Sequence, residues 1–419
     1  MMRFVLSGLI LLLVFCHIFS WDLSLAPGLS AKNAALYIAV SIIGFRMVAT
    51  GSFKMETGGF ITCNAALIAY SIASWLIAGL FIEYKSYTLL GTGITLKSTL
   101  VDPMLFCLVF LFGVRNSSDA IKVLKVLLVG VVLINLATLA DAFHIYSLGD
   151  YEEPGSNGRM GGPLGEANAY GAFIAMFLPP LCVAMVNSRG IARALWALGL
   201  AVSFGALLTT ASRAAFVAVA LSAILGIYAF RKYLSAAQIL PWLVKGMIGG
   251  ILVVAVISLE FGQLLVERLI GQSQGADLAT LSSGRTDFWM DPINQMMSHP
   301  ISLVTGFGWE TYSVMGFYLA PHNQYLYLWF TLGIPGLILG TMIYLIPMSA
   351  ARSAVSKADD DARSYLIAFW FSAVAAMIAI FFAQIFTPWP YFWSYAGLTM
   401  RLAINAQGGA QPEQKPLAS

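Results

Sequence analysis

Two arginines stand where a positive charge needs a binding partner. Arg213 lies in LLTTASRAAFVAV, between two apolar runs with almost no loop, and Arg285 follows SSG at the start of a predicted surface helix. A guanidinium presents a rigid fork of N–H donors that matches phosphate oxygens, and it stays charged at physiological pH. Both positions therefore predict anion binding, unless Arg213 only anchors the hairpin at a membrane surface. The alternative for Arg285 is a local ion pair with Asp287 or Glu267, which would stabilise little.

A third arginine and two asparagines complete the polar residues that could bind a ligand. Arg159 lies in NGRMGGPLGE, where glycines would let the backbone approach a ligand closely. Asn168 follows in GEANAYG, and Asn323 directly precedes an apolar run. We expect all three to contact the substrate. The alternatives are a solvated loop charge at Arg159 and helix caps at the two asparagines.

His322 is one of four histidines and lies between Pro321, a residue type that often opens a helix, and the apolar segment NQYLYLWFTLGIPGL. Its ring should lie near a helix N-terminus, where the helix dipole disfavours the imidazolium. A neutral imidazole can accept a proton from a hydroxyl, as a general base does. The alternative is an interfacial histidine that caps the helix or binds a headgroup. Because His17, His144 and His299 share no ligand spacing with it, we predict no metal site.

The elements that must hold these residues are membrane spans. The chain is 59% hydrophobic and only 10% charged, whereas a soluble domain carries about 25% charged residues. A span needs about 20 predominantly apolar residues. We therefore predict an all-α, polytopic integral membrane protein with about 12 transmembrane helices. The apolar runs lie near 4–20, 33–49, 60–82, 99–114, 120–140, 167–186, 194–211, 214–230, 244–262, 322–349, 364–385 and 388–404.

The distribution of basic residues predicts the orientation of the chain. With both termini in the cytoplasm, 16 of the 23 lysines and arginines fall on the cytoplasmic side, where basic residues near span ends are retained. The first apolar run is interpreted as a span and not as a signal peptide, because no small-x-small cleavage site follows it.

Two connections are long, and both fall on the external side in this topology. Long ordered loops are usually functional, and irregular backbone cannot face lipid. We therefore place the working site between these loops and the external ends of the helices. The predicted division is 1–262 with nine spans and a loop at about 141–166, a long external loop at 263–321, three spans in 322–404, and a cytoplasmic tail at 405–419.

The second loop contains a predicted surface helix in SSGRTDFWMDPINQMMSHP. Ser282 or Ser283 would cap its N-terminus, with Asp287 in the first turns. An apolar side suited to the membrane interface would be formed by Phe288, Trp289, Met296 and Met297.

Taken together, these segments resemble the O-antigen ligase and polymerase superfamily of bacterial envelope glycosyltransferases. The resemblance depends on four motifs in order: NGRMGGPLGEANAYG, TTASRAA between two spans, SGRTDFW followed by SHPISLVTGFGWETY, and HNQYLYLWFTLGIPGL. It covers the chain from about Gly158 onward, whereas the preceding residues match only as apolar spans.

The resemblance implies a GT-C-like fold and an enzyme without metal or other cofactor, located in the bacterial inner membrane with a periplasmic active site. Such an enzyme transfers a glycan from undecaprenyl diphosphate to a sugar hydroxyl of lipid A core or of a growing polysaccharide. Membrane lipids are its other partners, and no nucleic acid is expected. By resemblance, Arg213 and Arg285 bind the diphosphate and His322 is the histidine at the end of the large loop. Arg159 matches a glycine-rich element that is less uniform among members of the family.

Three alternatives to an O-antigen ligase stay open at this stage. An O-antigen or exopolysaccharide polymerase shares the same motifs. A transporter or lipid flippase would have broken helices and ionisable residues near the membrane midplane, and Arg46 and Asp102 are the main charges that favour it. A non-catalytic scaffold for envelope assembly would not need Arg213, Arg285 and His322 to converge.

Overall fold

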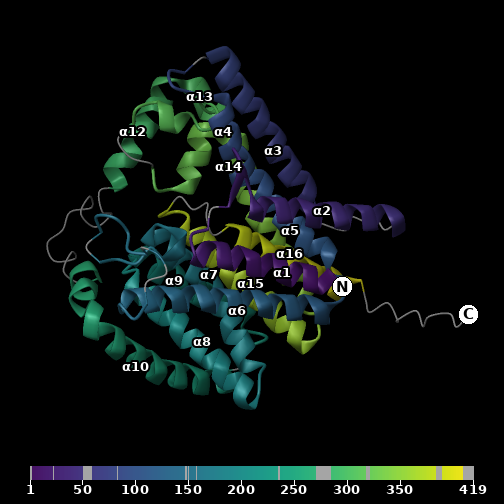
Figure 1. Ribbon diagram of the computed structural model, residues 1–419, viewed down its shortest axis with the longest axis vertical. Coiled ribbons are helices and arrows are strands. Elements are labelled where there is room, and N and C mark those ends of the chain that lie inside the picture. Colours follow the sequence, from purple (N-terminus) through teal and green to yellow (C-terminus); the bar gives the residue numbers. More distant parts are fainter. Residues whose placement is uncertain are drawn as a thin grey trace, which may run out of the picture.

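The described residues form a bundle of long α-helices, as the computed structural model in Figure 1 shows. The residues that the structure describes are 2–21, 23–50, 59–82, 84–146, 149, 151–156, 158–234, 236–269, 285–317, 321–383 and 389–408. Within three helices, the side chains of residues 236–243, 269, 285–287 and 389 lie outside this description.

The helices follow the apolar runs of the sequence, because backbone in lipid must satisfy its own hydrogen bonds. The α-helices are α1 (Met2–Ile18), α2 (Ala31–Thr50), α3 (Phe60–Ile77), α4 (Leu89–Leu96), α5 (Asp102–Gly113), α6 (Ser117–Ala142), α7 (Ala167–Val186), α8 (Gly190–Thr209), α9 (Arg213–Phe230), α10 (Ala236–Leu269), α12 (Arg285–Ser298), α13 (Pro300–Thr305), α14 (Gln324–Ala354), α15 (Asp360–Ala379) and α16 (Trp389–Gln407). The π-helical turns η1 (Ala78–Ile82) and η2 (Lys97–Val101) extend α3 and α4, and η3 (Gly162–Leu164) and η5 (Thr311–Val314) are 3₁₀ turns. Strands β1 (Ser24–Ala26) and β2 (Leu29–Ser30) form an antiparallel hairpin.

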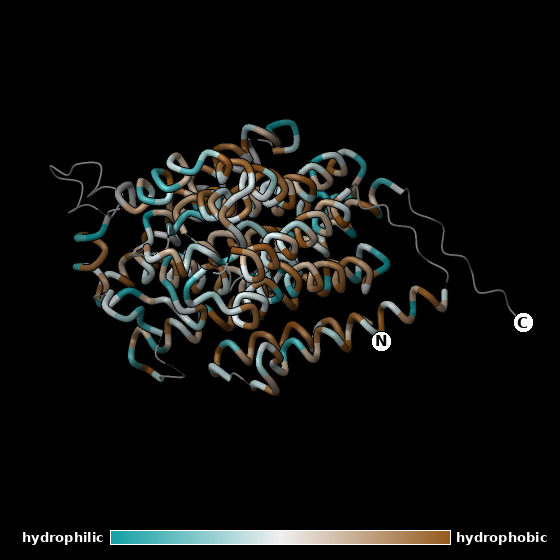
Figure 2. The backbone as a smooth tube through the Cα atoms, turned by 90° about the horizontal axis from the view of Figure 1, so that it is seen from above, coloured by the Kyte–Doolittle hydropathy of each residue, from teal (hydrophilic) through white to brown (hydrophobic). Residues whose placement is uncertain are grey.

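Among the described residues, 10 helices are long and apolar enough to cross a membrane. They correspond to ten of the predicted spans, so the chain is an all-α, multi-pass membrane protein. The two other predicted spans are also helices: α1 is apolar but has 17 residues, and α16 has 19. Figure 2 shows hydrophobic residues along the helices and hydrophilic residues mainly in the turns between them.

Helix α7 forms the centre of the bundle and packs against α8, α9 and α15. In the apolar stretch of 18 residues that could cross a membrane, 72% of the α7 residues are buried, against 17% for the corresponding stretch of α2. A buried polar network joins α6, α7 and α8: Asn135 accepts a hydrogen bond from Tyr170 at 2.8 Å and donates one to Ser203 at 2.9 Å. Because a buried amide must be paired, this network holds the three helices in one register.

The start of α1 and the end of α16 lie at the same end of the bundle. Arg3 in α1 pairs with Asp119 in α6 at 3.1 Å, and Asn405 in α16 donates to Ser117 at 3.3 Å. Helix α6 leads from this N-terminal end to the loop at 143–166, and its 26 residues span about 39 Å. We call the opposite end the loop end.

Helix α14 is broken at Gly333, where φ is 65° and ψ is −163°. The break frees the carbonyls of Phe330 and Thr331, which accept hydrogen bonds from the backbone N–H groups of Phe307 at 2.9 Å and Gly308 at 3.0 Å. A Cβ at Gly333 would lie 2.0 Å from a carbonyl oxygen, so the conformation requires glycine. The GFGWETY segment of the second loop therefore docks against a transmembrane helix and satisfies its free carbonyls.

One predicted span begins earlier than the sequence pattern suggests. The helical run α4, η2 and α5 starts at Leu89, and Asp102, one of the two charges that would favour a transporter, lies inside it. Asp102 is 4% exposed, pairs with Lys97 at 2.8 Å and accepts a hydrogen bond from Tyr37 at 2.7 Å. The two charges neutralise each other, and this pairing is what allows the helix to continue through them.

Candidate functional site

A cavity of about 250 Å³ lies at the loop end of the bundle, where segments far apart in the sequence converge. It brings together four of the six predicted site residues: Arg159, Asn168, Arg213 and His322. The other residues that line it are Glu153, Glu166, Ala211, Ala214, Arg268 and Phe288. We call it the loop-side cavity.

Arg159 is the most firmly held charge in this cavity. Its side chain is buried and donates to the carboxylate of Glu153 at 3.0 Å, to the side-chain oxygen of Asn168 at 3.1 Å and to the carbonyl of Thr210 at 3.0 Å. Burial lowers the pKa of the guanidinium, and the charge of Glu153 acts in the opposite direction. These bonds use three of the five N–H donors of the guanidinium, so Arg159 is an oriented group and not the solvated loop charge of the alternative interpretation.

Asn168 connects the glycine-rich loop to the α8–α9 turn. It donates to Glu166 at 2.7 Å, and its oxygen also accepts a hydrogen bond from Ser212 at 3.0 Å. Ser212 is in turn the N-cap of α9 and accepts from the backbone N–H of Ala215 at 3.4 Å. This short chain of hydrogen bonds fixes the start of α9, and therefore the backbone of Arg213, relative to Arg159.

The glycines around Arg159 are needed for backbone geometry. A Cβ at Gly161 would lie 1.9 Å from the carbonyl oxygen of Gly165, and Gly162 has a φ of 58° beside the ring of Tyr170. Both conditions exclude larger residues. The segment folds tightly over the ends of α6 and α7, and this placement carries Arg159 to the cavity.

Arg213 and Arg268 bring two further positive charges from different helices. Arg213 is the first residue of α9, and Arg268 lies in the last turn of α10, which continues to Leu269 and thus beyond the start of the predicted loop at 263. The two guanidinium groups are close enough to repel each other. An anion placed between them would replace that repulsion with attraction.

His322 faces the cavity from a strained turn ahead of α14. Its φ is 44°, in the left-handed region, which costs about 1–2 kcal/mol for a residue other than glycine. Hydrogen bonds hold the turn on both sides: Trp289 of α12 donates to the carbonyl of Pro321 at 2.7 Å, and Gln324 donates its backbone N–H to Ile380 at 2.9 Å. Strain that is maintained by neighbouring contacts is typical of functional sites.

Asn323 is a helix cap, which is the alternative role that the sequence suggested for it. Its side-chain oxygen accepts hydrogen bonds from the backbone N–H groups of Tyr325 and Leu326, both at 3.0 Å, and it is the N-cap of α14. The residue is 5% exposed and does not line the loop-side cavity. It positions His322, its neighbour in the chain, by fixing where the helix begins.

Arg285 opens the backbone of α12, and its side chain lies outside the described residues, as do the proposed caps Ser282 and Ser283. The helix itself is present where the sequence predicts it, and its Phe288 lines the cavity. Of its predicted apolar side chains, Met296 is buried against α14 in a small core cluster, whereas Met297 is 63% exposed.

Three charged residues of the cavity could not be selected from the sequence. Nothing in the local sequence distinguishes Arg268, Glu153 and Glu166 from the other charged residues of the two long connections. Glu153 pairs with Arg159, and Glu166 binds Asn168. The signal that could have found Arg268 is its place shortly after the apolar run that ends at 262, on the same side as the other candidates.

Glu310 is a partly buried acid that lies outside the cavity. It has a φ of 60° and accepts a short hydrogen bond from the hydroxyl of Tyr327. Burial raises the pKa of this carboxyl, and the hydrogen bond partly opposes the shift. The contact attaches the GFGWETY segment to the first half of α14, which follows the turn that carries His322.

The loop-side cavity therefore combines three guanidinium groups with an imidazole. Three guanidinium groups face two carboxylates, which leaves an excess of positive charge for a phosphate or diphosphate. The imidazole of His322 and the ring of Phe288 line the same cavity. Such an arrangement can bind a phosphorylated leaving group and activate a hydroxyl.

Comparison with known families agrees with the predicted resemblance. Residues 198–340, about a third of the chain, match the family model described as O-antigen ligase. The matched region contains Arg213, Arg268, Arg285 and His322, and it supports a ligase- or polymerase-type function in polysaccharide biosynthesis. The glycine-rich segment with Arg159 lies before the match, so its assignment depends on the cavity geometry. No curated protein matches the sequence.

Proposed function

We propose that the protein is an inverting glycosyltransferase that moves a glycan from undecaprenyl diphosphate to a sugar hydroxyl of lipid A core, as an O-antigen ligase does. The observation that carries this proposal is the convergence of Arg159, Arg213, Arg268 and His322 on one cavity. Two of these residues come from transmembrane helices and two from loops, so folding brings the charges together in spite of their repulsion.

The arginines would act on the leaving group. When the bond between the sugar and the phosphate breaks, negative charge grows on the diphosphate. Fixed guanidinium groups stabilise that growing charge more than they stabilise the bound substrate, which lowers the barrier. Arg159 is pre-oriented by its three hydrogen bonds, so it needs little reorganisation as the charge develops. Arg285 joins this group in the proposal through the family resemblance.

His322 would orient the acceptor hydroxyl and take its proton. The hydroxyl oxygen then forms a bond to the anomeric carbon as the bond from that carbon to the diphosphate oxygen breaks. Attack from the face opposite the leaving group inverts the configuration at this carbon. Glu153 and Glu166 lie in the same cavity, but hydrogen bonds to Arg159 and Asn168 already occupy them.

The proposed setting is the bacterial inner membrane, with both termini in the cytoplasm and the loop end in the periplasm. Two observations support this orientation. The start of α1 and the end of α16 lie at one end of the bundle, and the excess of lysine and arginine falls at that same end of the predicted topology.

A polymerase that extends lipid-linked repeat units remains the second candidate, because its donor and its chemistry are the same. A transporter or flippase is less well supported. A broken helix and a charge within a span would be expected of a transporter, but both have structural partners here. The free carbonyls at the break in α14 accept hydrogen bonds from Phe307 and Gly308, and the charge of Asp102 is neutralised by Lys97.

The experiment is reconstitution of the purified protein in lipid with an undecaprenyl-diphosphate glycan. Lipid A core and additional lipid-linked repeat units are supplied as acceptors in separate reactions, and Arg352→Gln, an exposed substitution in the last turn of α14, serves as a control. We expect product on lipid A core, made by wild type and control and lost in His322→Ala. Product only on lipid-linked units would assign the polymerase function, and no product with either acceptor would refute the transfer reaction.

A further inference from the structure

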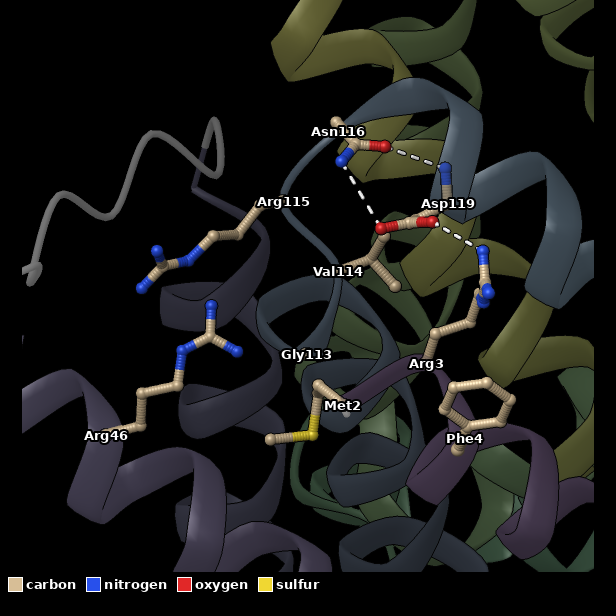
Figure 3. Close-up of a pocket in the computed structure, with 9 residues that line it drawn as sticks. All are labelled: Met2, Arg3, Phe4, Arg46, Gly113, Val114, Arg115, Asn116 and Asp119. Atoms are coloured by element: carbon tan, nitrogen blue, oxygen red, sulfur yellow. Dashed lines mark hydrogen bonds and ion pairs between the residues drawn. The ribbon is translucent and has the colours of Figure 1, made fainter. Parts of the chain in front are cut away.

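A second cavity, of about 330 Å³, lies at the N-terminal end of the bundle. Figure 3 shows its lining, which comes from the start of α1, the last turns of α2 and the junction between α5 and α6. Three arginines, Arg3, Arg46 and Arg115, surround it, and Asp119 is the acid that lines it. We call it the N-terminal cavity. None of the predicted site residues takes part in it.

The positive charges of this cavity are only partly compensated. Arg3 pairs with Asp119 at 3.1 Å, and Asn116 also binds that carboxylate at 3.3 Å. Arg46 and Arg115 lie side by side in Figure 3 and repel each other. Among the residues that the structure describes, neither of the two has a carboxylate within ion-pair distance. The cavity thus carries three positive charges against one negative charge.

The position of the arginines relative to the helices defines the surroundings of the cavity. Arg46 lies in the last turns of α2, Arg115 follows the end of α5, and Arg3 lies in the first turn of α1. All three are therefore at the boundary between apolar helix and water, at the depth of lipid headgroups. Large apolar side chains beside them are exposed: Phe4 by 70% and Phe45 by 77%. Such side chains suit lipid tails, so the cavity opens toward the membrane.

We propose that the N-terminal cavity binds the phosphate group of an anionic phospholipid from the adjacent leaflet. A phosphate between Arg46 and Arg115 would receive charge-assisted hydrogen bonds from two guanidinium forks and would remove the repulsion between them. The acyl chains would lie against the exposed apolar side chains of α1 and α2. Basic pockets between transmembrane helices on the cytoplasmic side bind lipid headgroups by the same chemistry.

Binding would also tie α2 to the bundle. This helix is little buried, because only 17% of the residues in its apolar stretch lie inside the protein. Its C-terminal half carries Arg46. A shared phosphate would connect it to the α5–α6 junction through Arg115. The lipid would then act as a structural ligand, some 39 Å along α6 from the loop-side cavity.

The test is native mass spectrometry of the full chain in neutral detergent, titrated separately with phosphatidylglycerol, phosphatidylcholine and inorganic phosphate. Wild type is compared with Arg46→Gln, Arg115→Gln and the double variant, and Arg352→Gln serves as the matched control. We expect phosphatidylglycerol to bind wild type and control. Each glutamine in the cavity should weaken this binding about tenfold, the loss typical of a charge-assisted hydrogen bond.

Further measurements identify the source of the phosphate and provide a control for variants that fail to fold. Arg46→Lys and Arg115→Lys keep the charge and should retain most of the binding if a glutamine variant fails to fold. Binding of inorganic phosphate without phosphatidylglycerol would overturn the lipid assignment in favour of a soluble phosphate compound. Equal binding of phosphatidylglycerol and phosphatidylcholine, or equal binding by wild type and the double variant, would overturn the site.

Discussion

The two cavities of this protein both gather arginines, but they are built in opposite ways. At the loop end, Arg159 is buried and makes hydrogen bonds to Glu153, Asn168 and Thr210. At the N-terminal end, Arg46 and Arg115 extend from helix ends and are exposed or partly exposed. The first arrangement fixes the direction of each N–H donor, whereas the second mainly supplies charge. Geometry of the first kind suits a developing charge in a reaction, and the second suits a mobile lipid.

The largest expected effect is at Arg213, where the comparison predicts that lysine cannot replace arginine. Arg213→Gln should reduce transfer by about 10³-fold, because one fixed donor to the leaving diphosphate is lost. Arg213→Lys keeps the charge but lacks the planar fork, so it should recover little. The measurement is the initial rate of product formation in proteoliposomes, with Arg352→Gln as control. Full activity of the lysine variant would mean that charge alone is sufficient at the loop end.

The second largest effect is expected at His322. It distinguishes a role of the imidazole as a base from a role of the residue in holding the backbone turn. Asparagine tolerates the left-handed conformation observed there, so His322→Asn should keep the turn and still lose about 10²-fold in transfer for want of a base. Binding of the lipid-diphosphate donor should be unchanged. A variant that transfers normally would show that the histidine is only a structural residue of the turn.

The third effect concerns stability and tests whether the loop end depends on its ion pair. Arg159→Met leaves Glu153 without its partner in a site where both side chains are largely covered, at 11% and 18% exposure. We expect a loss of about 3 kcal/mol in unfolding free energy, measured by denaturation in detergent. The double variant Arg159→Met with Glu153→Gln should recover part of the loss. Removing Arg46 at the other end should cost much less, because no carboxylate among the described residues depends on it.

The smallest effect is a pH dependence at Glu310, which binds Tyr327 of α14 at the loop end. Because burial raises the pKa of this carboxyl above its ordinary value, the folded state holds a proton that the unfolded state has released. Stability should therefore fall as the pH rises from the ordinary range of a carboxyl to the folded pKa. In Glu310→Gln this fall should be reduced, as thermal melts across pH would detect. An unchanged slope would contradict the assignment to Glu310.

Much of the fold could be predicted from the sequence because lipid imposes a simple rule. Each predicted apolar run contains a helix among its described residues, since backbone in lipid must pair with itself. The exceptions occur where charges pair or a loop intervenes. Lys97 and Asp102 stay inside a helical run because each neutralises the other, and the break at Gly333 exists because the GFGWETY segment takes its free carbonyls. Both depend on contacts between distant residues, which a linear pattern does not contain.

The candidate site was predictable by residue type but not by arrangement. Arg213 and His322 could be selected because each stands at the end of an apolar run, where a charge or an imidazole is conspicuous. Arg268 could not, because the predicted helix ended before it and nothing local connects it with Arg213. For Asn323, the position before a helix suggested two roles, a ligand contact and a helix cap. In the structure its side chain caps the helix.

The most direct test of the central claim is photo-crosslinking with an undecaprenyl-diphosphate analogue that carries its reactive group next to the diphosphate. The account predicts crosslinks to peptides that line the loop-side cavity, such as those with Phe288 and Arg268. These crosslinks should be retained in Arg352→Gln and lost in Arg213→Gln. Crosslinks that avoid these peptides, or that persist equally in Arg213→Gln, would contradict the assignment of the loop-side cavity as the diphosphate site.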